Sequence, residues 1–319
     1  MKDLRDRALK GFMKMKNDLG PSFNRDILST MTLIDSLIKP ILLYASDFWG
    51  CLKLPKNNPI ENLHMMMCKQ VLGVQKQTTN IGVLLELGRI PLGIWALKFA
   101  VKNWERIRLG HANKILIDAY NNSEVSWDAT MKSVLESNGM MNFYVNEPVR
   151  EFPFVYKRLF QQLIDNFHQR SLENIKDDSS KLRTYGLVKT EAGMEDYLQR
   201  VKNVKIRSQV TKLRLSNHRL SIETGRHSVP KVPRGERFCR FCLGHVEDEF
   251  HFLFECAALR HLRCRLLDPV TGTIPEFQYF PKEIKLKTLM SDIDFATCKY
   301  IADGMDLRNF LASKPRSYN

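Results

Sequence analysis

The amino-acid sequence predicts a mainly α-helical protein. Apolar residues recur at intervals of three and four positions along most of the chain, which is the period of an amphipathic helix. Glycine and proline stand at the ends of these segments, and the alternation typical of strands is weak throughout. With 319 residues, 44% of them hydrophobic, the chain is long enough for two or three lobes with a buried core.

The first 110 residues predict an N-terminal lobe that consists of several helices. Gly73, Gly88 and Gly110 each follow an apolar stripe, in the position where glycine ends a helix. Pro91 stands where proline suits the first turn of the next helix. The expected helices span residues 2–18, 26–37, 43–49, 60–72, 80–87 and 91–109.

The remainder of the chain predicts three further parts. Residues 111–190 predict a helical lobe with helices at 112–121, 126–138 and 154–168, and a polar linker near 171–180. Residues 191–267 predict two or three short basic helices, within 194–225, and then a small metal module. We expect residues 268–319 to form a partly ordered C-terminal tail.

Positive charge is concentrated in one window of the chain. The formal net charge is +14, and residues 200–240 contribute 12 Lys and Arg against only Glu223 and Glu236. Such clustering favours a polyanionic partner over an ordinary solvated surface, where both signs are expected to mix. We therefore expect phosphate contacts with RNA or DNA from Lys202, Lys205, Arg207, Lys212, Arg214, Arg219, Arg226, Arg237 and Arg240.

The sequence favours a reducing compartment and no membrane partner. The N-terminal segment is charged and lacks the apolar core of a secretory signal. The most apolar run, residues 37–52, is interrupted by Lys39, Pro40 and Asp47 and is too short for a bilayer. Seven cysteines in such a chain are expected to be free or bound to metal. We therefore expect a nuclear or cytoplasmic protein.

Four residues near the C-terminal end predict a zinc site. They form a Cys-x₂-Cys pair and a His-x₄-Cys pair, which are spacings typical of tetrahedral Zn²⁺ centres. Four protein ligands leave no open position for water, so the ion is expected to be structural. The expected ligands are Cys239, Cys242, His251 and Cys256. The nearby substitutes, which leave the fourth ligand open, are His245, His261 and Cys264.

Other residues with metal or stacking chemistry have simpler interpretations. His64 and Cys68 share one face of an expected helix, but no third ligand is in view, so a buried helix face is favoured. We expect a short helix from His251 to Arg263. Aromatic side chains near the metal motif can stack on bases, but a mini-core around the ion is favoured. These are Phe238, Phe241, Phe250, Phe252 and Phe254.

Several segments together carry a family resemblance. They are residues 36–50, 68–74, 86–92, 104–107, 213–220, 222–227 and 247–253, in that order. In this order they resemble the region after the polymerase core in non-LTR (LINE-type) retrotransposon reverse transcriptase polyproteins. The resemblance spans roughly residues 5–265. It implies the end of a thumb, a helical connector and a Cys-Cys-His-Cys zinc knuckle, with retroelement RNA or target DNA as the partner.

The chain lacks the residues that the family's enzymes need. Tyr44 to Asp47 imitates the family's Tyr-x-Asp-Asp hairpin, but Ser46 stands where a metal-binding aspartate is required. Asp268 and the Glu283–Lys285 stretch only weakly imitate the Asp…Glu-x-Lys motif of a restriction-like nuclease. We therefore expect neither polymerase nor nuclease activity and name no catalytic residue.

The sequence thus predicts a non-catalytic nucleic-acid-binding fragment of a retrotransposon reverse transcriptase-like protein, with a structural zinc knuckle. A self-association or scaffold function is the alternative, through an exposed patch of Leu43, Phe48, Trp49 and residues 65–67. Such a patch would also suit a reverse transcriptase core supplied in trans. A retroelement remnant without a selected function is a third reading. The preference for RNA or DNA and the sequence specificity stay open.

Overall fold

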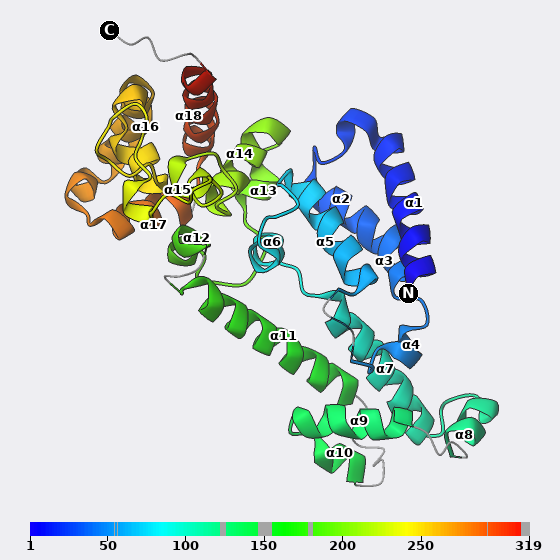
Figure 1. Cartoon of the computed structure of the whole chain (residues 1–319). Coiled ribbons are helices and arrows are strands. Elements are labelled where there is room, and N and C mark those ends of the chain that lie inside the picture. Colours follow the sequence, from blue (N-terminus) through cyan, green and yellow to red (C-terminus); the bar gives the residue numbers. More distant parts are fainter. Residues whose placement is uncertain are drawn as a thin grey trace. The chain divides into compact units, whose positions relative to one another are not determined.

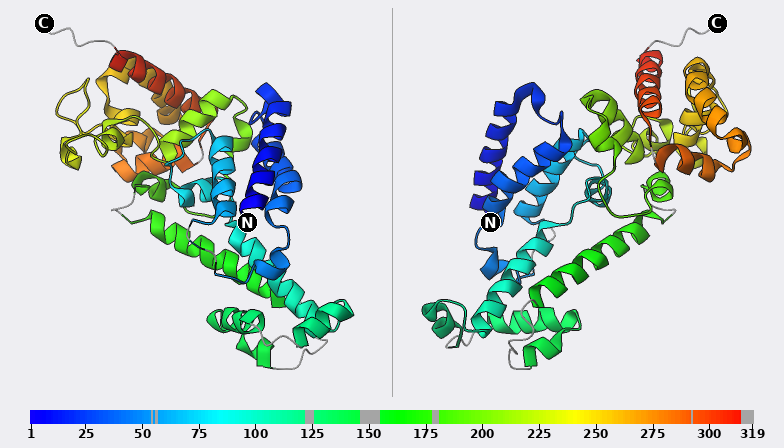
Figure 2. Two further views of the ribbon diagram at one scale, coloured as in Figure 1. Left: turned by 45° about the vertical axis from the view of Figure 1, so that its right-hand side comes forward. Right: turned by 180° about the vertical axis from the view of Figure 1, so that it is seen from behind.

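The computed structural model describes residues 1–53, 55, 57–121, 126–145, 155–177, 181–291 and 293–313. Helices supply the regular structure of this part (Figures 1 and 2). It contains no β-strand, only isolated bridges that join Leu87 to Met194 and Phe238 to Val246. The predicted mainly α fold class is therefore confirmed. Among the described residues, no helix has the length and apolar character needed to span a bilayer.

The chain divides into two compact units, each assembled from separated segments. Unit 1 contains residues 1–20, 31–67 and 89–170, and unit 2 contains residues 21–30, 68–88 and 171–319. The lobes expected at 1–110, 111–190, 191–267 and 268–319 are consecutive, so they do not coincide with these interleaved units. Tertiary contacts between distant segments decide the division, and periodicity along the chain does not reveal such contacts.

Unit 1 is built on helices whose apolar stripes follow the predicted pattern. In α1 the buried side chains are Ala8, Phe12 and Met15. The helices of this unit are α1 (Lys2–Leu19), α3 (Lys39–Leu42), α4 (Ser46–Trp49), α7 (Leu92–Arg108), α8 (Lys114–Asn121), α9 (Ser126–Ser137) and α10 (Met141–Val145). The helices with residues in both units are α2 (Ile27–Leu33), α5 (Pro59–Leu72) and α11 (Val155–Ile175). A π-type turn, Ile34–Ile38, follows α2.

Helix α7 is central to the packing of unit 1. Its Trp104 is buried in a cluster with Met131 and Leu135 of α9. Helix α4 packs against α7, and a Cβ at Gly50 would overlap the carbonyl oxygen of Ala96. Only glycine allows the two backbones to approach so closely. The helices of unit 1 therefore pack around α7.

The apolar patch expected on this unit is only partly present. Leu43, Met65 and Met67 are buried, so the prediction that they are exposed is wrong. Phe48 is half exposed, while Trp49 is partly buried and its indole nitrogen donates to the carbonyl of Tyr44 over 2.9 Å. Met65 and Met67 are two residues apart and lie on roughly opposite sides of α5, and both are buried because this helix is covered on more than one side.

Unit 2 holds the basic segment and the metal motif. Helix α14 packs along α18, α16 also packs on α18, and α12 packs on α17 (Figures 1 and 2). Three short helices lie within the expected range 194–225: α13 and α14 carry basic residues, whereas α15 carries none. The helices of unit 2 are α6 (Asn80–Glu86), α12 (Arg183–Val188), α13 (Tyr197–Arg200), α14 (Val204–Arg214), α15 (Ser221–Thr224), α16 (Arg260–Thr273), α17 (Lys282–Ser291) and α18 (Phe295–Ser313).

The C-terminal part is more regular than expected. Residues 282–291 and 295–313 form α17 and α18, and Tyr300, Ile301 and Met305 of α18 are buried. Residues 314–319 lie outside the described residues. In the expected linker at 171–180, residues 171–175 continue α11, and residues 178–180 lie outside the described residues. The polar composition of this segment therefore did not mark the end of the helix. Residue 154 of the helix expected at 154–168 also lies outside the described residues.

Candidate metal centre

Cys239, Cys242, His251 and Cys256 come together in unit 2 as a group that could hold a metal ion. One ligand atom from each residue lies within 4.8 Å of the other three. The Sγ atom of Cys256 lies 4.0 Å from that of Cys239 and 3.7 Å from that of Cys242. A tetrahedral zinc ion with Zn–S bonds of about 2.3 Å separates its sulfurs by about 3.8 Å. The sulfur positions therefore fit such an ion.

The first two ligands lie on a tight turn. The amide of Cys239 donates to the carbonyl of His245 over 2.7 Å, and the amide of Leu243 donates to the carbonyl of Cys239 over 3.1 Å. Gly244 has a φ of 92°, a conformation that glycine adopts without strain. These bonds fold the chain back on itself and point the thiols of Cys239 and Cys242 toward one place.

The other two ligands lie at the two ends of a π-type turn, His251–Glu255. The amide of Cys256 donates to the carbonyl of His251 over 2.8 Å, which brings residues five apart onto the same side. The continuous helix expected from His251 to Arg263 is therefore wrong. The chain leaves the helical conformation at Cys256, with ψ of 118°, and α16 begins at Arg260.

Contacts within the cluster shift the pKa values of Cys239, His251 and Cys256 in different directions. A hydrogen bond from the Cys256 thiol and further donors outweigh burial and lower the pKa of Cys239 to about 3. The same bond, with burial, raises the pKa of Cys256. Burial lowers the pKa of His251, but its interactions with Cys239 and Cys242 outweigh burial and raise that pKa to about 9. A divalent ion would replace the protons of these groups at one centre.

His251 supplies a second sign that a partner belongs here. Its side chain is buried, and neither ring nitrogen has a hydrogen-bond partner among the described residues. A buried nitrogen without a partner costs roughly 1–3 kcal/mol, so such atoms are rare in folded proteins. Nδ1 lies 3.5 Å from a carboxylate oxygen of Glu255, a close contact that is not a hydrogen bond. The donor set of three thiols and one imidazole therefore fits zinc.

The structure also ranks the substitute ligands. His245 lies with His251 and Glu255 in a second group whose ligand atoms are within 4.8 Å of one another, and the two imidazole rings stack at 5.8 Å. His261 and Cys264 are exposed and belong to neither group. His64 and Cys68 belong to no such group among the described residues, and both are buried, in agreement with the simpler interpretation.

The aromatic residues near the ligands mostly form a small core. Phe250 and Phe252 are buried, and the ring of Phe254 lies 6.1 Å from that of Phe277. The ring of Phe252 also lies 6.0 Å from that of Tyr300. This packing agrees with the expected mini-core for Phe250, Phe252 and Phe254, whereas Phe238 is 45% exposed and does not fit it.

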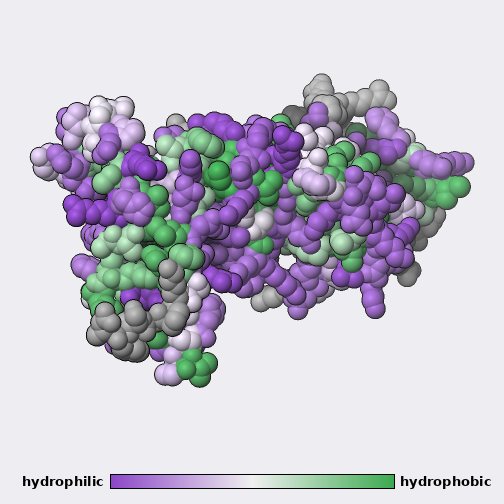
Figure 3. Space-filling model, turned by 90° about the horizontal axis from the view of Figure 1, so that it is seen from above, coloured by the Kyte–Doolittle hydropathy of each residue, from purple (hydrophilic) through white to green (hydrophobic). Residues whose placement is uncertain are grey.

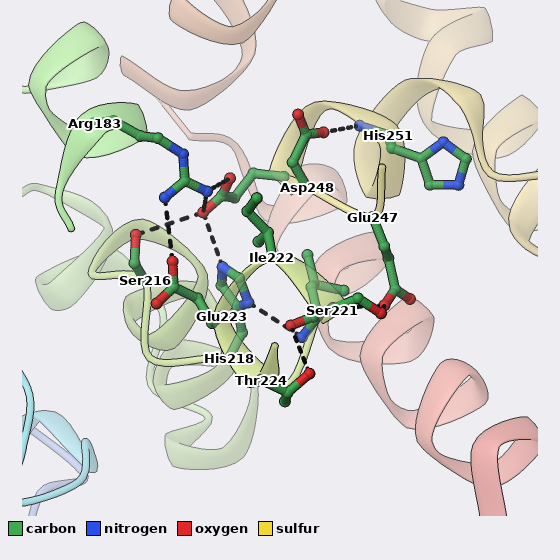
Figure 4. Close-up of polar contacts among 12 residues, drawn as sticks. Arg183, Ser216, His218, Ser221, Ile222, Glu223, Thr224, Glu247, Asp248 and His251 are labelled. Carbon is green, nitrogen blue, oxygen red and sulfur yellow. Dashed lines mark hydrogen bonds and ion pairs between the residues drawn. The ribbon is translucent and has the colours of Figure 1, made fainter. Parts of the chain in front are cut away.

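Consecutive carboxylates anchor the segment that leads to His251 (Figure 4). Asp248 accepts a hydrogen bond from the amide of His251 over 2.8 Å. One oxygen of Glu247 accepts from the amide and hydroxyl of Ser221 over 2.7 and 2.6 Å. Arg308 of α18 pairs with the two Glu247 oxygens over 2.8 and 2.7 Å. The position of His251 is thus fixed by contacts to α15 and α18.

Glu249 anchors the same segment on its other side. Arg183 donates to it over 2.9 Å and His218 over 2.9 Å, and Figure 4 shows Arg183, Ser216 and His218 converging on one carboxylate. Arg183 also pairs with Glu223 over 3.1 Å. These bonds connect the metal motif to α12 and to the segment before α15.

The Glu249 anchor predicts acid sensitivity. Burial raises its pKa, but the hydrogen bond from His218 and the charges of His218 and Arg183 outweigh burial and lower it to about 2. The ionised Glu249 therefore contributes about 3 kcal/mol to the free energy of unfolding above about pH 4.5, and this contribution is lost as the pH falls toward 2. Urea unfolding of the wild type and of Glu249→Gln should show that the difference between their free energies of unfolding becomes smaller as the pH falls through this range. Parallel pH profiles would contradict the assignment.

Two predicted phosphate contacts are wrong because their side chains are buried. Arg214 forms ion pairs with Glu86 over 2.8 Å and with Glu195 over 2.7 Å, and its side chain is fully buried. Arg207 is 2% exposed and donates to backbone carbonyls, including that of Val201 over 2.6 Å. Both guanidinium groups therefore serve the interior of unit 2.

The other predicted contacts stay at the surface but differ in their partners. Lys202 and Lys205 are exposed and pair with Asp26 and Asp306, so part of their charge is already balanced. Three further arginines donate hydrogen bonds within unit 2. Arg226 donates to Glu223, and Arg240 donates to the carbonyl of Ala312. Arg237 donates to the carbonyls of Val232 and Ile222. Arg219 is exposed beside Lys212, and together with burial its charge lowers the pKa of Lys212.

Cations from distant segments, which the basic window of the sequence did not include, lie beside that window. Burial and the charges of Lys181 and Lys76 lower the pKa of Lys69. Burial lowers the pKa of Lys181. The charge of Glu223 raises this pKa, and the charge of Arg226 lowers it further. Burial and the charges of Arg226 and Arg234 also lower the pKa of Arg237, against Glu223. We call these residues the basic cluster: Lys69, Lys76, Lys181, Arg226, Arg234 and Arg237. Lys69 is its buried member, and its ammonium group donates to the carbonyl of Lys76 over 2.7 Å.

No family of known proteins matches this chain, and neither a curated protein nor a solved structure matches it. Inference about function therefore rests on the chain's own residues. They provide a group of four side chains that could hold a metal ion and a cluster of cations in the same unit.

Proposed function

We propose that unit 2 binds RNA or DNA and that a structural Zn²⁺ ion holds part of its fold. The support for zinc is the donor set, because three cysteines and one histidine at tetrahedral spacing suit this ion. Four protein ligands fill the coordination sphere, so the ion stabilises the fold and carries out no chemistry.

The observation that carries the nucleic-acid part is the basic cluster. Lys69, Lys181 and Arg237 come from three separated segments, and burial together with neighbouring cations lowers the pKa of each. Glu223 opposes this effect at Lys181 and Arg237. Bringing like charges together costs free energy, and a row of phosphates would recover it by neutralising them and releasing counterions. Lys231 and Arg234 are also exposed next to the metal motif.

Surface chemistry supports the same proposal. The face in Figure 3 is mostly hydrophilic, with smaller hydrophobic areas between. Phosphate contacts need long cationic side chains in water-accessible positions, and these supply affinity without reading sequence. The proposal therefore includes no claim of sequence specificity and no preference between RNA and DNA.

The origin of the chain is part of this proposal. The order of the segments described above resembles the post-polymerase region of a LINE-type reverse transcriptase, where RNA or target DNA is the natural partner. We propose a non-catalytic fragment of such a protein in the nucleus or cytoplasm, with the polymerase core supplied in trans if one is needed. Ser46 in place of a metal-binding aspartate supports the non-catalytic assignment.

Charge reversal in the basic cluster tests the proposed function. With roughly five to eight phosphate contacts, affinity for an RNA or DNA duplex should fall a hundredfold or more between about 50 and 200 mM salt. Lys76→Glu combined with Arg234→Glu should lower affinity at least about tenfold and reduce the salt slope by about 2. Both side chains are exposed, so the fold should persist.

The matched control reverses two exposed cations elsewhere in unit 2, Arg265 on α16 and Lys299 on α18. Fluorescence anisotropy across a salt series measures the slope for both double variants, and circular dichroism checks their helix content. Equal losses in the two double variants would mean that net charge alone governs binding. Binding that ignores salt would refute the phosphate mechanism.

A further inference from the structure

Unit 1 contains a cavity that the proposed function does not use. Its volume is about 510 Å³, and its wall is formed by α3, α4 and α7. Volumes of roughly 300–1,000 Å³ are typical of small-molecule sites. The cations of the wall are Lys39, Lys102 and Arg106. A cavity with several cations in its wall is suited to an anion.

Helix α7 supplies most of this chemistry because of its spacing. Trp95, Phe99, Lys102 and Arg106 recur at intervals of three and four residues, so they share one face of the helix and line the same cavity. Lys102 and Arg106 are one turn apart and both are exposed, so one anionic group can reach both. The apolar rings beside them lower the local dielectric and strengthen the attraction.

Asn103 shows that a ligand acceptor is missing. This residue lines the cavity and is only 6% exposed, yet its side-chain amide nitrogen has no hydrogen-bond partner among the described residues. A buried donor without an acceptor costs roughly 1–3 kcal/mol. A ligand oxygen at this wall would supply the acceptor.

Lys39 is held in an unfavourable state that an anion would relieve. Burial lowers its pKa to about 8, with Asp35 opposing and the cations of Arg89 and Lys98 adding to the effect. Its ammonium group lies 3.5 Å from the centre of the Trp95 ring. Asp35 offers little compensation, because it forms a paired contact with Arg89 over 2.9 and 2.5 Å and lies 3.9 Å from Lys39.

We propose that this cavity binds a phosphate group, held by Lys39, Lys102 and Arg106 with Asn103 as a neutral donor. Asp47 is the remaining carboxylate of the wall and would favour a phosphate held toward α7. A phosphate can come from a free phosphorylated small molecule or from the backbone of a nucleic acid. The site lies entirely in unit 1, so it does not depend on the function proposed for unit 2.

Calorimetric titration of the full chain with inorganic phosphate, adenosine monophosphate and a short RNA tests this site. The background should carry the Lys76→Glu and Arg234→Glu changes, so that the basic cluster of unit 2 contributes little. Lys102→Glu with Arg106→Glu should weaken binding of the phosphate probes at least about tenfold, the loss expected when two charge-assisted contacts are removed. Asn103→Asp should also weaken binding, since it replaces a donor with an anion.

The control for charge is Lys10→Glu, an exposed change on α1 of the same unit. If inorganic phosphate or the mononucleotide binds and the cavity variants lose it, the source is a small molecule. If only RNA binds with the same dependence on the variants, the source is a nucleic-acid backbone. The proposal is overturned if no probe binds, or if the cavity variants bind as well as Lys10→Glu does. Thermal melts verify that each variant is folded.

Discussion

Replacement of Cys239 with Ser is expected to unfold the metal module and to lower the free energy of unfolding by on the order of 5 kcal/mol. The Cys239 thiol is fully buried, and its Sγ lies 4.0 Å from that of Cys256. Loss of one ligand abolishes tight zinc binding, which contributes about 10–16 kcal/mol in small zinc modules, while the surrounding core retains part of the fold. Chemical unfolding followed by circular dichroism measures the loss.

The matched control is Cys264→Ser, because this cysteine is exposed and lies outside the ligand group. The free energy of unfolding of Cys264→Ser should equal that of the wild type. A chelator should reduce the stability of the wild type and of Cys264→Ser to the level of Cys239→Ser, and should not change Cys239→Ser further. If the wild type is equally stable with and without chelator, then the ligand group is only a packing feature.

Replacement of Arg214 with Met is expected to destabilise unit 2 by about 3–5 kcal/mol, the cost of leaving a buried charge without its partner. Arg214 is fully buried, pairs with Glu86 and Glu195, and also donates to the carbonyl of Met290 over 2.5 Å. Burial lowers its pKa, but the two carboxylates outweigh burial and raise it. The chevron or urea midpoint of the variant measures the loss.

Two comparisons separate charge from volume at this position. Arg219→Met removes an exposed arginine that follows α14, and it should change the free energy of unfolding by less than about 0.5 kcal/mol. Combining Arg214→Met with Glu86→Leu removes both partners and should recover part of the loss, because no unpaired charge is left at Glu86. An Arg214→Met protein as stable as Arg219→Met would contradict the stabilising role assigned to the buried ion pairs of Arg214.

The group of four residues that could hold a metal ion could be predicted because its signal is local. Cys239 and Cys242 are separated by a tight turn, and His251 and Cys256 by a single helical turn, so short-range geometry alone brings each pair together. The unexpected detail is the π-type turn, whose five-residue hydrogen bond replaces the start of a regular helix. Residues five apart in a regular α-helix are separated by about 140° around its axis, so the π-type turn is what brings the two side chains to the same side.

The interior roles of Arg207 and Arg214 could not be predicted for the opposite reason. Glu86, the partner of Arg214, is 128 residues away along the chain, and Arg207 donates to a carbonyl 182 residues away at Arg25. An arginine in a basic window looks like a phosphate contact until a distant carboxylate or carbonyl is seen beside it. The same limit hid Lys69 and Lys181, whose closeness depends on how unit 2 is assembled.

The fold class followed from periodicity, while the division into units did not. The apolar stripes of residues 2–18 and 91–109 correspond closely to α1 and α7. Unit 2, in contrast, takes residues 21–30 and 68–88 from the N-terminal half, because α6 supplies Glu86 to the buried network around Arg214. Pairings of this kind are tertiary and carry no local signal.

The most direct test is the metal content of the purified full chain and its variants, measured by mass spectrometry of the metal after dialysis. The ligand geometry predicts one Zn²⁺ per chain in the wild type and in Cys264→Ser, and none in Cys239→Ser or His251→Ala. A wild-type chain that is folded and free of metal, or a Cys239→Ser chain that keeps its zinc, would contradict the account.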